Sequence, residues 1–168
     1  MSSYADLYAT DVEPDAQRAD LDARKRFHLQ CRYHVPLMWL ALYEPTELVM
    51  LPWCKEEPDE AWPYLVGQVD AAVPRLQRRM ASIAAAFPSV DATQFAADFS
   101  ADLLRARQRF VVLDSWGIGM MSAGRLAWQA ELGRIVAAAC DGDWSVYLRS
   151  FPVEHDRTDD DWEQYFIG

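Results

Sequence analysis

Cysteine is scarce in this sequence, and so are lysine and long apolar runs. The chain has three cysteines, Cys31, Cys54 and Cys140, which lie far apart and form no CxxC pair. An odd and scattered set of cysteines argues against a disulfide framework and against a zinc knuckle. The longest apolar stretch, residues 35–43, is well short of the roughly 20 residues that span a bilayer. We therefore expect reduced cysteines and no transmembrane helix.

Positive charge is in short supply as well. The chain has 16 Lys and Arg against 26 Asp and Glu, which gives a net charge of −10. Phosphate backbones and anionic membrane surfaces repel such a surplus of carboxylates, so we expect neither nucleic acid nor membrane as a partner. The first 22 residues are acidic and polar, without the basic and apolar regions of a signal peptide. A cytoplasmic location is therefore expected.

The apolar content is sufficient for one folded domain. Hydrophobic residues make up 51% and aromatic residues 12% of the 168 positions, which suits a single core of ordinary size. Residues 1–24 are acidic with little apolar periodicity, and we interpret them as a flexible N-terminal arm. Residues 25–168 are interpreted as one globular domain.

Several segments have strand patterns. Residues 27–34 alternate apolar and polar side chains, as a strand with one buried face does. The run 37–43 has no polar face, which is typical of a strand covered on both sides. The β-branched, apolar run 110–113 predicts a buried strand over residues 109–114. Residues 47–51 form a further strand or a turn of helix, and the alternation over 144–148 predicts another strand. The final aromatic segment, 162–167, pairs as an edge strand or docks on the core.

Three helices are predicted among these strands. An apolar stripe runs from near residue 59 to Phe87, with Pro74 expected to kink or split the helix. Asp91 and Gln94 form a capping box for the second helix. Ser122 is expected to cap the third, which ends near Gly142. The element order predicts a single α+β domain, with about three helices on one face of a mixed or mainly antiparallel sheet.

The turn at residues 114–119 is the most suggestive local motif. Gly117 and Gly119 lie between a predicted strand and a predicted helix, where backbone N–H groups can cradle a phosphate. The pattern lacks the last glycine of GxGxxG, and a tight turn is the favoured interpretation. Ser115 leaves the strand as a nucleophile does, but Leu113 replaces the first glycine of the nucleophile elbow. We find no complete catalytic set and expect no enzyme.

Metal ligation has two weak candidates. The spacing His28-x-x-Cys31-x-x-His34 supplies suitable ligands, but on a strand the two histidines share one face and the cysteine takes the other. The acidic segment 154–161 is rich in oxygen but lacks the spacing of an EF-hand. We therefore expect neither a metal site nor a cofactor.

Charge and aromatic residues favour binding over catalysis. Residues 141–168 carry 8 acidic and 2 basic side chains, which would steer a basic protein partner, while a tryptophan would anchor it. The leading hypothesis is an acidic bacterial inhibitor of the immunity or antitoxin type. The expected partner-binding residues are Asp156, Asp159, Asp160, Asp161, Trp162 and Trp116.

The alternative hypothesis is a small enzyme or ligand-binding domain built on the 114–119 turn. Its ligand would contact residues of the turn and of the first predicted strand: Ser115, Gly117, Gly119, His28, Arg32 and His34. Monomer and homodimer both stay open.

Overall fold

A five-stranded antiparallel sheet organises the protein. The computed structural model describes residues 3–12, 27–52, 60–88, 90–152 and 166. The strands of the sheet are β1 (Tyr4–Thr10), β2 (Phe27–Arg32), β3 (Leu48–Pro52), β4 (Ala61–Gln68) and β5 (Phe110–Asp114). Their order is β2-β1-β5-β4-β3, and all four pairings are antiparallel. The strands predicted within residues 27–34 and 109–114 are thus confirmed, and of the two alternatives for residues 47–51 the strand is the one observed.

Strand β1 overturns the expected N-terminal arm. Residues 4–10 lie between β2 and β5, and the apolar side chains Ala5, Leu7 and Ala9 are fully buried. The alternation of these residues with polar neighbours was the strand signal, and the acidic composition of the first 24 residues obscured it. A flexible arm over residues 1–24 is therefore wrong for residues 4–10, and residues 13–26 lie outside the described part of the chain.

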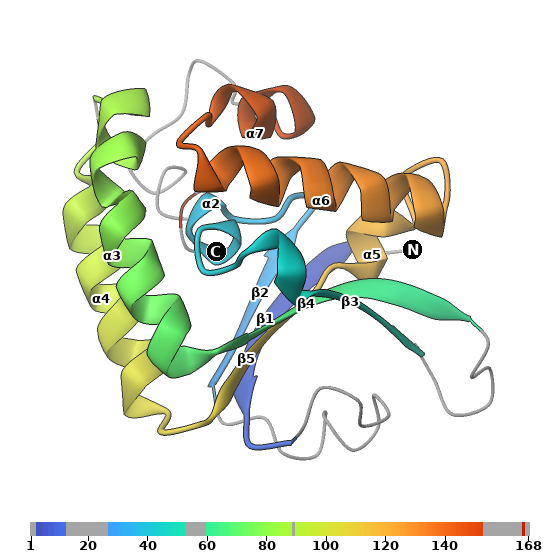
Figure 1. The fold of residues 1–168 in the computed structure, drawn as a ribbon, viewed down its shortest axis with the longest axis horizontal. Helices are drawn as coiled ribbons and strands as arrows, with labels where there is room; N and C mark the ends of the chain where they lie inside the picture. The colour runs from blue at the N-terminus through green and yellow to red at the C-terminus, as the bar shows by residue number, and fades with distance from the viewer. Residues whose placement is uncertain (1–2, 13–26, 53–59, 89, 153–165, 167–168) are drawn as a thin grey trace.

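One face of the sheet is covered by the long helices α3 (Val69–Ala86), α4 (Ala92–Arg105) and α6 (Arg125–Cys140) (Figure 1). Leu7, Leu65 and Leu113 from the sheet share one apolar core with these helices. The single α+β domain with three long helices on one face is therefore confirmed.

The opposite face of the sheet is also buried over its central strands. A second apolar cluster there contains Tyr8, Leu51, Trp62, Tyr64, Val66, Phe110 and Val112. Every residue of β5 is buried as a result. This explains why β5 has no alternation in the sequence, because both of its faces are covered.

Two segments predicted as strands are short helices. Residues 37–40 form α2 and residues 145–150 form α7, and both pack against the helix-covered core. A short run of apolar residues is compatible with either a strand or a buried helix, so the pattern alone does not separate them. In the same way, residues 61–68 were assigned to the first helix but form β4, and α3 begins only at Val69.

Some of the predicted helix boundaries are confirmed and others are wrong. The Asp91 carboxylate accepts a hydrogen bond from the Gln94 N–H at 3.4 Å, as expected of an N-cap. Gly142 follows α6 with a φ of 74°, as expected after a helix C-terminus. The capping position of Ser122 was wrong, because α6 begins at Arg125 after Gly124. Helix α3 continues through Pro74 without a break.

A fully buried backbone segment is held by two arginines of α3. Residues 37–43, which contain α2, are 0% exposed. The Arg79 guanidinium donates to the carbonyls of Ala41 and Tyr43 at 2.9 and 2.7 Å. The Arg75 guanidinium donates to the carbonyl of Leu42 at 2.5 Å. Three consecutive carbonyl oxygens that are shielded from water thereby gain partners, which buried backbone requires.

The charges of these arginines are matched by acids of the following 3₁₀ helix, η1 (Pro45–Glu47), and its N-cap. Glu44 lies 3.0 Å from Arg75 and 2.9 Å from Arg79, and Glu47 lies 2.7 Å from Arg75. The Cys140 thiol of α6 donates to Glu44 at 3.1 Å and accepts from Arg79 at 2.9 Å. We call these five side chains the arginine network: Glu44, Glu47, Arg75, Arg79 and Cys140.

Replacing Arg79 tests the arginine network. We expect Arg79→Ala to lower the free energy of unfolding by about 3 kcal/mol, because two buried carbonyls and Glu44 lose a charged donor. Arg78→Ala is the matched control, since Arg78 is exposed on the same helix and should change stability by no more than about 0.5 kcal/mol. Urea unfolding followed by circular dichroism measures both values. Equal stability of the two variants would contradict a stabilising role for the network.

The pH dependence of Cys140 is a second test. Burial, and then the hydrogen bond to Glu44, raise the pKa of the Cys140 thiol from 9.0 to about 11. The thiol in the unfolded chain loses its proton first, so stability should fall as pH rises above about 9. Alkylation of Cys140 in the folded protein, followed by peptide mass spectrometry, should therefore titrate near pH 11. Glu44→Gln should shift this titration downward, and a titration near 9 in the parent protein would refute the raised pKa.

Candidate functional site

The turn after β5 satisfies its own backbone. The Asp114 carboxylate accepts from the Trp116 N–H at 3.0 Å, and the Gly119 N–H donates to the Ser115 carbonyl at 2.9 Å. The N–H groups of Met120, Met121 and Ser122 also bond to carbonyls within the turn. The four-residue helix α5 (Trp116–Gly119) lies in this turn. These five N–H groups are used within the turn and are therefore not available to a phosphate.

The two glycines of the turn are required by close packing. A Cβ at Gly117 would lie 2.5 Å from the backbone oxygen of Tyr4, and a Cβ at Gly119 would lie 2.6 Å from the Trp128 ring. Ser115 is fully buried, and its hydroxyl accepts a hydrogen bond from the Trp128 indole at 2.9 Å. The structure thus explains all three residues as contacts between α5, β1 and α6.

Alanine at these glycines tests this explanation. We expect Gly117→Ala to lower the free energy of unfolding by about 1–3 kcal/mol, because the added methyl group meets rigid backbone. Gly133→Ala is the matched control: its Cβ would have only an ordinary contact of 3.4 Å with Leu48. Helix propensity should make that variant about 0.5–1 kcal/mol more stable. Unchanged urea midpoints for Gly117→Ala would show that the turn has room for a side chain.

The polar face of β2 meets an acid that the sequence analysis did not consider. The His28 imidazole lies 2.6 Å from the Asp6 carboxylate, and the Gln30 amide donates to the same oxygen at 3.1 Å. Asp6 is also the register partner of Asp114 on β5. The expected ligand surfaces, β2 and the turn, are therefore separated by β1. Asp6 was missed because residues 1–24 were interpreted as an arm.

A carboxylate-bonded imidazole can serve as an acid–base group. The nucleophile considered from the sequence is Ser115. Its hydroxyl is buried and accepts a hydrogen bond from the Trp128 indole. Among the described residues, His28 and Asp6 therefore form a polar contact at the edge of the sheet and do not complete a Ser–His–Asp arrangement.

His34 does not share a face with His28, and that expectation is wrong. Tyr33 has a φ of 70°, so the chain turns after β2. This turn places the His34 ring nitrogens 3.5 Å from the Cys31 sulfur. Within the described ranges, no group of three or more metal-ligating side chains is assembled. The Arg32 guanidinium stacks over two tyrosine rings. Its central carbon lies 4.6 Å from the ring centroid of Tyr33 and 5.8 Å from that of Tyr4.

The expected partner-binding residues are described only in part. Trp116 is half-buried, and its ring packs edge-on against Trp62 with centroids 6.3 Å apart. It therefore contributes to the second apolar cluster as well as to the surface. The remaining expected residues lie outside the described part of the chain: Asp156, Asp159, Asp160, Asp161 and Trp162.

An exposed apolar surface follows α5 directly. All eight residues from Met120 to Ala127 are exposed, and the side chains of Met120, Met121 and Leu126 are 46%, 53% and 70% accessible. We call these three residues the methionine patch. The patch is not evident from the sequence, because Leu126 has the spacing of the buried side of a helix that begins at Ser122, whereas α6 begins at Arg125.

The methionine patch lies at the end of the sheet where β1 starts. Gly117 in α5 contacts the backbone of Tyr4, and the Tyr33 N–H donates to the Ser3 carbonyl at 2.9 Å. Tyr33 is itself 57% exposed. Figure 1 shows α5 and the start of α6 beside the N-terminus, on the opposite side of the molecule from the α3–α4 pair. An apolar surface and an exposed aromatic ring therefore occupy the same end of the molecule.

None of the helices in the described part of the chain is long and apolar enough to span a membrane. Comparison with family models, curated proteins and solved structures finds no match to this chain.

Proposed function

We propose that this protein is a non-catalytic interaction module that binds a basic protein partner, as an immunity-like or antitoxin-like inhibitor does. The observation that carries the proposal is the methionine patch. Single exposed apolar residues are common on protein surfaces, but three large apolar side chains within one exposed eight-residue segment favour a contact surface. Methionine is suited to this role because its flexible thioether adapts to the shape of a partner.

The charge of the chain supports a basic partner. A net charge of −10 attracts cations at long range, and the acidic residues Asp156, Asp159, Asp160 and Asp161 add to this attraction. In such an arrangement charge sets the association rate, and buried apolar contact sets the dissociation rate. The packed turn at Gly117 and Gly119 also favours this function over ligand binding at the turn.

The methionine patch can be tested by substitution. We expect Leu126→Asn together with Met121→Asn to weaken capture of the partner at least roughly tenfold, because a central apolar contact is commonly worth 1–2 kcal/mol. The matched control is Ala85→Asn, an exposed position on α3. The measurement is affinity capture of the partner by each variant from lysate of cells that make the protein, at 50 and 500 mM salt. Mass spectrometry then identifies and quantifies the captured proteins.

The proposal requires one dominant basic protein that is retained by the Ala85→Asn control, lost from the patch variant and released by salt. With that partner purified, Asp159→Lys, Asp160→Lys and Asp161→Lys together should slow association at low salt. If the patch variant and the control capture the partner equally well, the methionine patch is not part of the partner-binding surface. Association rates that are independent of salt and of the lysine substitutions would reject charge steering.

A further inference from the structure

The most exposed methionines of the described part of the chain lie side by side in the methionine patch. The side chains of Met120 and Met121 are 46% and 53% accessible. Met50 and Met80 are half-buried, and Met38 is fully buried in the helix-covered core. An oxidant that approaches thioether sulfur from solvent should therefore react first at the patch.

The thiols of the described cysteines compete poorly for such an oxidant. Peroxides react with the thiolate form of an accessible cysteine. Cys31 is 1% exposed. Burial, and then the hydrogen bond to Glu44, raise the pKa of the Cys140 thiol to about 11, so this thiol keeps its proton at neutral pH. A thioether has no proton to lose, so its reaction does not depend on such a titration.

The backbone of the methionine patch is fixed, although its side chains are exposed. The Met120 N–H donates to the Trp116 carbonyl at 2.9 Å, and the Met121 N–H donates to the Ile118 carbonyl at 3.0 Å. Neither methionine belongs to the two apolar clusters of buried residues. An oxygen atom added to either sulfur would therefore change the surface and leave the core intact.

We propose that Met120 and Met121 form a site of reversible oxidation by hydrogen peroxide, and that this oxidation removes the apolar character of the methionine patch. A bond forms between the thioether sulfur and one peroxide oxygen, and the O–O bond breaks. The other oxygen takes the proton of the first and leaves as water. The sulfur loses two electrons and becomes a polar sulfoxide. Sulfoxide reductases reverse the step, with two thiols oxidised to a disulfide and the oxygen released as water.

The effect of this oxidation on partner binding rests on the proposed function. Two of the three apolar side chains of the patch become polar, and only Leu126 is unchanged. A sulfoxide oxygen buried against an apolar partner surface loses its hydrogen bonds to water without replacement. The net charge of −10 that attracts the partner is the same in both forms. Oxidation should therefore raise the dissociation rate and leave the association rate nearly unchanged.

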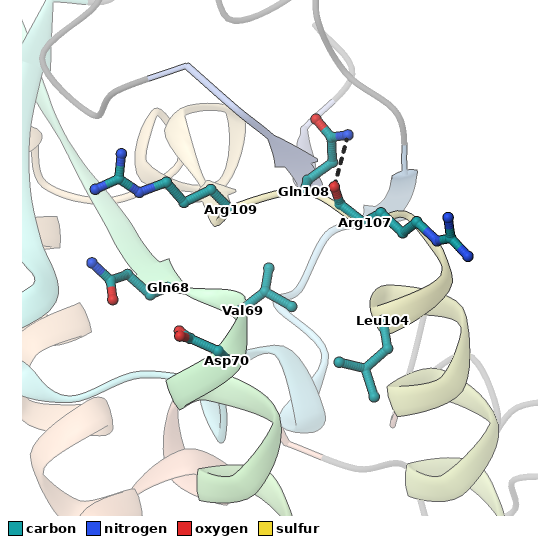
Figure 2. A pocket seen from close by; sticks show the side chains of 7 residues that line it. All are labelled: Gln68, Val69, Asp70, Leu104, Arg107, Gln108 and Arg109. Atoms are coloured by element: carbon teal, nitrogen blue, oxygen red, sulfur yellow. Dashed lines mark hydrogen bonds between the residues drawn. The ribbon is translucent and has the colours of Figure 1, made fainter.

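Leu104 supplies a control position for this effect. It is 51% exposed and lies beside a hollow at the opposite end of β5, among polar and charged side chains that include Asp70 and Arg107 (Figure 2). Leu104→Met therefore introduces an exposed thioether outside the methionine patch. Oxidation at this position should not change partner binding.

Peptide mass spectrometry of the folded full chain after peroxide treatment tests the site itself. We expect sulfoxide to form at Met120 and Met121 at least roughly fivefold faster than at Met50 and Met80, because reaction follows exposure. The urea midpoint should stay unchanged, since the modified side chains lie outside both apolar clusters. Equal rates at these four methionines, or earlier oxidation of Cys140, would overturn the proposal.

Retention on a phenyl chromatography medium measures the apolar character of the surface without a partner. Peroxide-treated protein should elute earlier than untreated protein, and sulfoxide reductases for both sulfur epimers, with dithiothreitol, should restore the retention. Met120→Leu together with Met121→Leu keeps the patch apolar but removes both sulfurs, so peroxide should not change its retention. An unchanged retention of the parent protein, or an equal loss in the leucine variant, would refute the proposal.

Binding of the purified partner separates this inference from the proposed function. Peroxide should weaken binding to the parent protein at least roughly tenfold. It should leave binding to the leucine variant unchanged, also after Leu104→Met is added to that variant. Equal weakening in the leucine variant would show that the patch methionines are not the switch. If no partner is captured, the proposed function fails, and the oxidation site is still decided by peptide mapping and retention.

Discussion

The arrangement of this protein depends on how the carbonyls of residues 41–43 are satisfied. The segment around them is fully buried beneath the helices, where an unpartnered backbone oxygen would cost about 1–3 kcal/mol. Arg75 and Arg79 reach these oxygens from neighbouring turns of α3 and thereby fix the position of α3 relative to the segment. Two buried cations in turn require Glu44 and Glu47, and the thiol of Cys140 ties α6 to the same network. The network thus connects three elements of the helical layer.

Burial on both faces of the sheet decides where function can be located. Strand β5 is buried over its whole length and pairs with β1 and β4, so its middle offers no surface. What remains accessible is at the two ends of the strand. The loop after it carries the methionine patch, and the segment before it carries Arg107 and Arg109. The exposed residues that flank β5 are therefore a consequence of the packing that buries the strand itself.

The sequence predicted elements where one local signal was sufficient. The alternation over residues 27–32 identifies β2, the β-branched run identifies β5, and Asp91 marks the start of α4. It failed where tertiary packing decides between two local structures. The apolar run at 37–40 forms a helix that leads into carbonyls bonded by arginines of α3, and no local pattern contains that tertiary contact.

The same limit applies to β4 and to the candidate site. Trp62, Leu65 and Val66 have the spacing of a helix face, yet all three are buried because β4 has a core on each side. Pro63 is tolerated there because pairing with β5 begins only at Tyr64. Asp6, on β1, is adjacent to His28 on β2 only through the strand register. Contacts of this kind depend on the order of strands, which the polarity of a segment does not encode.

The ends of β5 are expected to act independently. Coupling between two sites requires an element with two alternative arrangements that both ligands influence. Strand β5 is the direct link between Arg109 and α5, and it is buried and paired along both edges, so any shift of it would break hydrogen bonds to β1 and β4. The glycines of α5 are likewise fixed against Tyr4 and Trp128. A change near Arg109 therefore reaches the methionine patch only through movement of α3 or α4, and the arginine network opposes movement of α3 by holding it to residues 41–47.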